Sequence, residues 1–236
     1  MKSKFLTVLL ALVVSTAANA QLGGLGGLVG GLGGGKGGGG GDVEAQVQAF
    51  NNEANLINKT VAYALIQIEA ALGDKTNIAG IKALNESLSK STDTKEIGAI
   101  TREVTKTLAA TTLEHLKSQD AKAKMESLSP EMQKKIGQSI FSIGVAALRL
   151  PGAINQGQNI VSGISSNPMN ITKVMPVKDG LSLFADVLPK LPALVSTGFQ
   201  LMRDVKIEPG NPTATATLNP QAPDPSAFVE SPAAKG

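Results

Sequence analysis

The sequence predicts an all-α protein, a helical bundle of about five to seven helices between two disordered ends. Apolar residues recur at intervals of three and four residues, helix-starting and helix-ending residues separate these runs, and glycine and proline gather at the chain ends. We therefore expect four parts, listed here in order: a signal peptide at residues 1–20, a Gly-rich flexible segment at 21–41, a helical domain at 42–206, and a Pro-rich disordered tail at 207–236.

The N-terminus has the three parts of a cleavable secretory signal peptide. Lys2 and Lys4 form a short positive region, residues 5–14 are almost wholly apolar, and residues 18–20 (Ala-Asn-Ala) suit a signal peptidase. The apolar run is about half of the roughly 20 residues that a membrane-spanning helix needs. We therefore expect cleavage after Ala20 and export of the mature protein to the periplasm or the extracellular medium.

The composition argues against several function classes. Cleavage removes two of the 22 basic residues and leaves 20 against 19 acidic ones, so the formal charge of the mature chain is near +1. Because nucleic-acid binding needs a clustered positive face, we expect no nucleic-acid partner. Six Phe, one Tyr and no Trp leave few stacking platforms for carbohydrate or single-stranded nucleic acid. The chain has no cysteine, which excludes disulfides and a lipid-anchored cysteine.

The segment after the predicted cleavage site is of low complexity. Fourteen of the 21 residues at 21–41 are Gly, and four leucines punctuate them: Leu22, Leu25, Leu28 and Leu32. Because glycine loses more backbone entropy on ordering than any other residue, we expect a flexible spacer. The alternative is a sticky segment that meets a partner or a membrane surface through its leucines. Lys36 is followed by Gly, not Ser or Thr, so the run is no phosphate-binding loop.

A long first helix is expected to begin near Asp42, which can cap it. Its apolar residues are alternately four and three apart and form one stripe about eight turns long: Val43, Val47, Phe50, Ala54, Ile57, Val61, Ala64, Ile68 and Ala71. Gly73 fits the left-handed position that ends a helix. The stripe suits a helix within a bundle or a coiled-coil dimer. Its alanines weaken a dimer seam and favour the bundle, and the oligomeric state stays open.

Two shorter helices are expected next. The first runs over about residues 77–90, on the spacing of its Ile and Leu residues. The second begins after Asp93, because Asp93 and Glu96 have the spacing of a capping box, and we expect it to continue to about Leu128.

A fourth helix is expected to start at Ser129-Pro130-Glu131, which provides a capping hydroxyl, a proline at the first position and an acid at the positive end of the dipole. Because Pro151-Gly152 is a strong stop signal, we expect this helix to end at Leu150. Further helices are expected at about 178–188 and 191–205, with Pro176, Pro189 and Pro192 as breaks between elements.

Charge is distributed unevenly along the helical domain. Residues 42–135 contain 25 charged side chains, whereas residues 136–206 contain nine. Because a charge-poor helix is usually buried, we expect residues 136–150 to form the central core helix. We also expect the charge-poor C-terminal half to provide a contact surface for a partner.

The last 30 residues hold six of the twelve prolines, together with Thr, Ala, Asn and Ser. This composition predicts a disordered, solvated tail. The alternative is a docking motif around Phe228 and Val229, which are the only adjacent pair of large apolar residues in the tail.

The sequence contains no set of residues that indicates a catalytic site or a metal-binding site. The single histidine, His115, cannot alone make a His-based zinc site, and beside Glu114 we expect it to be a solvated helix residue. No Gly-x-Ser-x-Gly motif marks a nucleophile. We therefore nominate no catalytic, cofactor-binding or metal-binding residue and expect no enzyme. Glycosylation patterns at Asn58, Asn85 and Asn170 are interpreted as chance matches.

Three functional hypotheses follow. The leading one is a non-catalytic exported protein that acts through protein–protein contacts in the cell envelope. The alternative is a protein that binds an apolar ligand or a membrane surface, since helical bundles can hold lipids between their helices. The third is an enzyme that uses only carboxylates, amides and lysines, and a cavity that gathers the sparse charged residues of 136–206 would support it.

Overall fold

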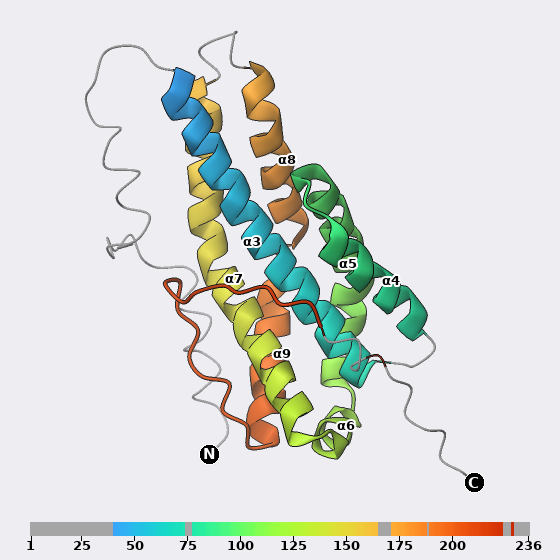
Figure 1. The fold of residues 1–236 in the computed structure, drawn as a ribbon. Coiled ribbons are helices and arrows are strands. Elements are labelled where there is room, and N and C mark those ends of the chain that lie inside the picture. Colours follow the sequence, from blue (N-terminus) through green and yellow to red (C-terminus); the bar gives the residue numbers. More distant parts are fainter. Residues whose placement is uncertain (1–39, 74–76, 165–170, 188, 224–227, 229–236) are drawn as a thin grey trace. The chain divides into compact units, whose positions relative to one another are not determined.

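The computed structural model of the chain describes residues 40–73, 77–164, 171–187, 189–223 and 228 (Figure 1). Within these residues the protein has seven α-helices and no β-strand, which confirms the predicted all-α bundle. The helices are α3 (Gly40–Leu72), α4 (Ile78–Lys90), α5 (Thr94–Lys117), α6 (Ala121–Ser127), α7 (Pro130–Ile164), α8 (Ile171–Val187) and α9 (Leu191–Asp204). The predicted signal peptide and the first part of the Gly-rich segment lie outside the described residues.

Helix α3 is the central element of the bundle. It packs most extensively against α7 and α5, and it also contacts α8 and α4 (Figure 1). The middle of the predicted apolar stripe is buried within this one chain: Phe50, Ala54, Ile57, Val61, Ala64 and Ile68. The bundle interpretation of the heptad spacing is therefore confirmed. Residues 60–70 are buried on every side of the helix, so something other than the helical core must also cover α3.

Residues 136–150 belong to helix α7, which is a core helix as the scarcity of charge predicts, but the central position belongs to α3. Ile136, Ile140, Ile143 and Leu150 are buried, and the helix contacts α3, α8 and α9. Its predicted end at Leu150 is wrong, because the helix continues through Pro151 to Ile164.

The physical reason for this continuation is the apolar spacing beyond the proline. Proline removes one helical hydrogen bond, but the buried positions continue at intervals of three and four: Leu150, Ala153, Gly157, Ile160 and Ile164. The tertiary contacts along this face offset the missing bond. The same correction applies to α8, where Pro176 lies inside the helix and does not precede it, with Val174 and Val177 buried on either side.

The expected long helix from Asp93 to Leu128 is in fact two helices, α5 and α6. Ser118 adopts an extended conformation after α5, and its hydroxyl donates to the carbonyl of His115 at 2.7 Å. A serine side chain that bonds to the preceding turn competes with the helical ladder. The interruption at residues 118–120 follows from this local bond.

Two predicted helix starts are confirmed in atomic detail. The Asp93 carboxylate accepts a hydrogen bond from the Glu96 N–H at 2.9 Å, and the Ser129 hydroxyl accepts one from the Met132 N–H at 3.2 Å. The reciprocal half of the capping box differs from expectation, because the Glu96 carboxylate accepts from the Ser91 hydroxyl at 2.8 Å.

The end of α3 depends on glycine for a different reason from the one expected. Gly73 does not have a positive φ. A Cβ at Gly73 would lie 2.5 Å from both the carbonyl oxygen and a carboxylate oxygen of Glu69. Glycine is therefore required by the close approach of Glu69 and not by a left-handed conformation.

The interior is tightly packed around Phe50. Its ring meets the ring of Phe184 edge-on, with centroids 6.1 Å apart and planes at 73°. Gly157 of α7 and Gly180 of α8 lie against the Phe50 ring, where an added Cβ would approach ring carbons to 2.7 Å and 2.9 Å, respectively. These two glycines let three helices meet around one aromatic side chain.

None of the helices in the described part of the chain combines the length and the apolar character needed to span a lipid bilayer.

Candidate functional site

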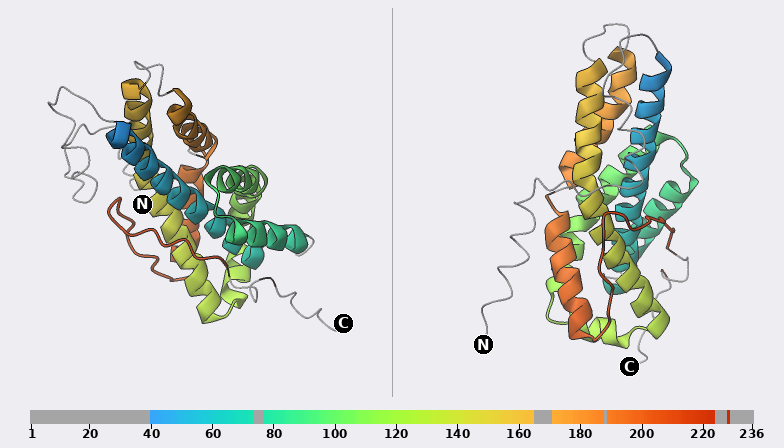
Figure 2. Two further views of the ribbon diagram at one scale, coloured as in Figure 1. Left: turned by 45° about the horizontal axis from the view of Figure 1, so that its top comes forward. Right: turned by 90° about the vertical axis from the view of Figure 1, so that its left-hand side faces the viewer.

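The C-terminal residues 207–223, which we call the strap, follow a defined path over the helices. The strap has neither helix nor strand, as its composition predicts, but it is not free of the body. It rises along α7, turns at residues 213–216, and then crosses α7 and α3 toward α4 (Figure 1; Figure 2, right). Leu218 and Pro223 are buried. The solvated tail expected from composition is therefore corrected for these residues.

A tight helix end directs the chain into the strap. After α9, the N–H of Ile207 donates to the carbonyl of Met202 at 2.8 Å, and the N–H of Lys206 donates to that of Arg203 at 3.0 Å. Lys206 has a φ of 61°, which is the left-handed conformation. Together these features form a Schellman motif, which satisfies helix-end carbonyls and reverses the chain.

The rising part of the strap lies directly on α7. A Cβ at Gly144 would meet the Pro212 ring at 2.9 Å, so the absence of a side chain at this position allows the contact. Gly210, with a φ of +80°, lies beside the ring of Phe141. Two glycines, one on each partner, therefore set the distance between the strap and α7.

An ion pair anchors the turn of the strap. Arg149 of α7 donates through Nη2 to Glu53 of α3 at 2.8 Å and through Nη1 to the Ala216 carbonyl at 3.4 Å. The side chains of Arg149 and Glu53 are 19% and 12% exposed, so water screens this pair only in part. One guanidinium thus joins two core helices to the main chain of the strap.

Asn85 of α4 holds the far end of the strap. Its Nδ2 donates to the Pro223 carbonyl at 3.3 Å, and the residue is 6% exposed. Its Oδ1 is buried and has no hydrogen-bond partner among the described residues. Because Asn85 and Asn58 are both buried, neither glycosylation pattern is accessible in this fold, and Asn170 lies outside the described residues.

A cavity of about 710 Å³ separates the crossing part of the strap from the helices beneath it. One face of α3 lines it, with residues at the helical spacing i, i+3, i+4 and i+7: Thr60, Tyr63, Ala64 and Gln67. Residues of α7 line the opposite side, among them Gln138, Phe141 and Ser142. The strap thus passes over the side of α3 that carries Thr60, Tyr63, Ala64 and Gln67. We call this lined surface the strap groove.

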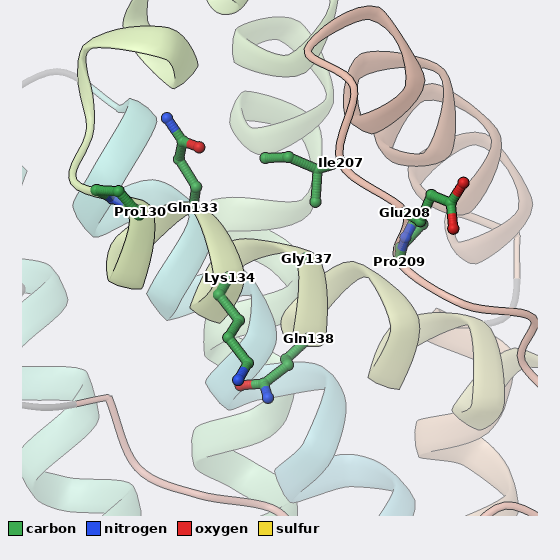
Figure 3. Close-up of a pocket in the computed structure, with 8 residues that line it drawn as sticks. All are labelled: Pro130, Gln133, Lys134, Gly137, Gln138, Ile207, Glu208 and Pro209. Atoms are coloured by element: carbon green, nitrogen blue, oxygen red, sulfur yellow. The ribbon is translucent and has the colours of Figure 1, made fainter.

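A smaller recess of about 240 Å³ lies at the root of the strap, between residues 207–209 and the N-terminal part of α7. Figure 3 shows that Lys134 and Gln138 extend together on one side of it, whereas Glu208 points away from them. The charged groups around this recess do not converge on a common point.

The histidine is placed differently from the prediction. His115 is not a solvated residue, because its side chain is 21% exposed and its Nδ1 lies 3.0 Å from Oε1 of Glu69. The Glu69 side chain is only 4% exposed. This pair joins α3 to α5, and neither residue lines the two cavities described above. No motif in the sequence marks Glu69, although it is the sole charged residue in the run Thr60–Leu72.

Neither of the two cavities described above supports the enzyme hypothesis. The two cavities are not lined by any of the nine charged residues of 136–206. No three His, Asp or Glu side chains in the described ranges come together in a way that suits a metal ion. Phe228, part of the suggested docking motif, is buried against the chain's own core, and Val229 lies outside the described residues.

Searches of protein-family models, of curated proteins and of solved structures found no match to this chain.

Proposed function

We propose that this chain is a non-catalytic exported protein that acts through protein–protein contacts in the cell envelope, and that the strap groove is its contact surface. The observation that carries the proposal is the manner in which the helices hold the strap. Side chains of two helices donate to main-chain carbonyls of an extended segment, Arg149 to Ala216 and Asn85 to Pro223. Because every residue has a main-chain carbonyl, side-chain donors of this kind can hold an extended segment of another sequence.

The contact surface differs from the one that the charge distribution suggested. Helices α7, α8 and α9 each bury one face, with Ile140, Val177 and Leu194 in the core, whereas their outer faces are exposed and carry few charges. The groove instead uses the polar face of α3 and the neighbouring face of α7.

A site-specific photo-crosslinker tests the contact surface in cells of the source organism. The crosslinker replaces Gln138, which is exposed and lines the groove, and in a matched control it replaces Lys122, which is exposed on α6 away from the groove. We expect a discrete protein adduct from position 138 that is absent from position 122. Identical adducts from both positions, or none from position 138, would contradict the proposal.

Export has its own test. N-terminal sequencing of the protein isolated from the envelope or the medium should begin at Gln21, directly after the predicted cleavage site. A chain that retains Met1 and stays with the cytoplasmic fraction would contradict export.

Binding of an apolar ligand or a membrane surface is the alternative proposal, and the volume of the strap cavity favours it, since ligand pockets are about 300–1,000 Å³. The hydroxyl and amide groups of Thr60, Gln67 and Ser142 in its lining suit a peptide better than a lipid. Native mass spectrometry and liposome flotation distinguish the two, because only the alternative predicts co-purifying lipid or flotation.

A further inference from the structure

The strap does not fill the groove that it covers. The groove is partly open to solvent, and about 710 Å³ remains between the crossing part of the strap and the two core helices. The strap residues at this cavity are mostly short or cyclic, among them Thr217, Pro220 and Ala222. A segment with longer side chains fits the same path and occupies more of the space.

The strap also leaves one hydrogen-bonding group unused at its far end, beside the groove. Asn85 Nδ2 donates to the Pro223 carbonyl, while Asn85 Oδ1 is buried without a partner among the described residues. In an extended chain the N–H and C=O of one residue point to the same side, so a side-chain amide can pair with both. Proline has no N–H to donate. Any other residue at the place of Pro223 supplies the donor that Asn85 lacks.

The charge of the groove restricts its occupant. Residues 211–223 of the strap contain no charged side chain. The lining of the cavity contains one, Lys135, which already pairs with Glu131 at 3.0 Å. The remaining polar lining consists of hydroxyl and amide groups, which bond to neutral polar groups without the cost of burying an ion.

We propose that the strap groove is a docking site for an extended, uncharged segment of a partner protein, which displaces the strap. The segment has an apolar residue at the place of Leu218 and uncharged polar residues over the cavity. Five positions after the apolar residue it has a residue other than proline, whose N–H bonds to Asn85. This inference rests on the proposed function and adds the chemistry of the partner to it.

Synthetic peptides of residues 211–223 test this proposal against the full-length mature chain. The host carries Leu218→Asp, which removes the buried anchor of its own strap. One fluorescent peptide has the native sequence and a second has Pro223→Ala, and anisotropy reports their binding. We expect the Pro223→Ala peptide to bind about fivefold more tightly, the factor that one added hydrogen bond provides. Both should bind the wild-type chain more weakly, because its own strap competes.

Two controls make the comparison specific. A Pro223→Ala peptide that also carries Leu218→Asp should not bind. In a host with Asn85→Leu the two peptides should bind equally, which separates the hydrogen bond from the intrinsic stiffness of proline. Equal affinities in the host that retains Asn85, or no binding of either peptide, would overturn the proposal.

A second measurement covers the case in which Leu218→Asp prevents folding. In the otherwise wild-type chain, Pro223→Ala should slow amide hydrogen exchange at residues 217–219, 221 and 222 several-fold, and it should not do so when Asn85 is Leu. An unchanged exchange rate overturns the proposal. The proposal is also overturned if the wild-type chain is a dimer that dissociates when it carries Leu218→Asp. In that case the occupant of the groove is the strap of a second copy. If neither peptide binds but a crosslinker at position 138 still gives a protein adduct, the proposed function is retained. Only the partner chemistry inferred here is then rejected.

Discussion

The interior around Phe50 and the groove beneath the strap both lie where distant parts of the chain meet. The packing at the two places is opposite. At Phe50, two glycines allow backbones to close around a ring that is wholly buried. Under the strap, a few anchors hold a segment above a cavity of about 710 Å³. This difference underlies our proposal that the second contact is an exchangeable cover, whereas the first specifies the fold.

The largest expected effect comes from removing the ring at the interior contact. Phe50→Ala should lower the free energy of unfolding by about 3–5 kcal/mol, because it leaves a cavity that the surrounding helices cannot fill. Urea denaturation measures the change. Leu148→Ala on α7 is the control, since that side chain is 47% exposed and its loss should stay within about 0.5 kcal/mol. Similar losses for the two variants would contradict the packing described here.

The Glu69–His115 pair is a polar counterpart of the interior contact. His115→Ala should destabilise the chain by about 1–3 kcal/mol, because it takes a hydrogen-bond partner from a carboxylate that is only 4% exposed. Its neighbour Glu114 is exposed, so Glu114→Ala should change the unfolding free energy by less than about 0.5 kcal/mol. Thermal and urea unfolding of both variants make the comparison, which fails if His115→Ala is as mild as its control.

Two glycines on α7 allow a direct comparison between a position that is packed against other side chains and a position that is open. A Cβ at Gly157 meets the Phe50 ring, whereas a Cβ at Gly152 meets nothing within 4 Å. Gly157→Ala should cost about 1–2 kcal/mol, as overpacking exceeds the gain in helix propensity. Gly152→Ala should instead stabilise by about 0.5–1 kcal/mol. Changes of the same sign in urea denaturation would show that the surroundings do not decide the outcome.

The smallest expected effect is at the junction of the bundle and the strap. Lys206 holds a left-handed φ of 61°, which a residue with a Cβ adopts at a cost. Lys206→Gly should stabilise the chain by about 0.5–1 kcal/mol, after the greater freedom of glycine in the unfolded chain is subtracted. The melting temperature, measured at fixed protein concentration, should rise by a few degrees. A decrease would mean that the lysine side chain has a stabilising contact.

The sequence predicted the elements whose signals are local or strongly periodic. The middle of the α3 stripe, the caps at Asp93 and Ser129, and a core-facing helix over 136–150 are confirmed. The helix boundaries predicted at Pro151 and Pro176 are wrong, because tertiary contacts on both sides of each proline outweigh its local tendency to end a helix. The spacing of apolar residues beyond Pro151 contained the missing signal.

The groove was predicted less well than the fold, for a physical reason. The strap is fixed by contacts between residues distant in sequence, such as Asn85 with Pro223 and Arg149 with Ala216, and composition has no information about such contacts. Its polar, proline-rich residues resemble those of a solvated tail. The Glu69–His115 pair was detectable in principle, since a lone carboxylate in an otherwise uncharged helix needs a partner.

Native-state hydrogen exchange on the full chain tests the central claim, that the strap opens independently of the bundle, most directly. We expect amides of α3 between residues 61 and 68 to exchange only through global unfolding, with a strong dependence on urea. Amides of the strap between residues 213 and 219 should exchange through a local opening that is much more frequent and nearly independent of urea. Strap amides as protected and as urea-dependent as those of α3 would contradict this account, because the strap would then be a fixed part of the folded core.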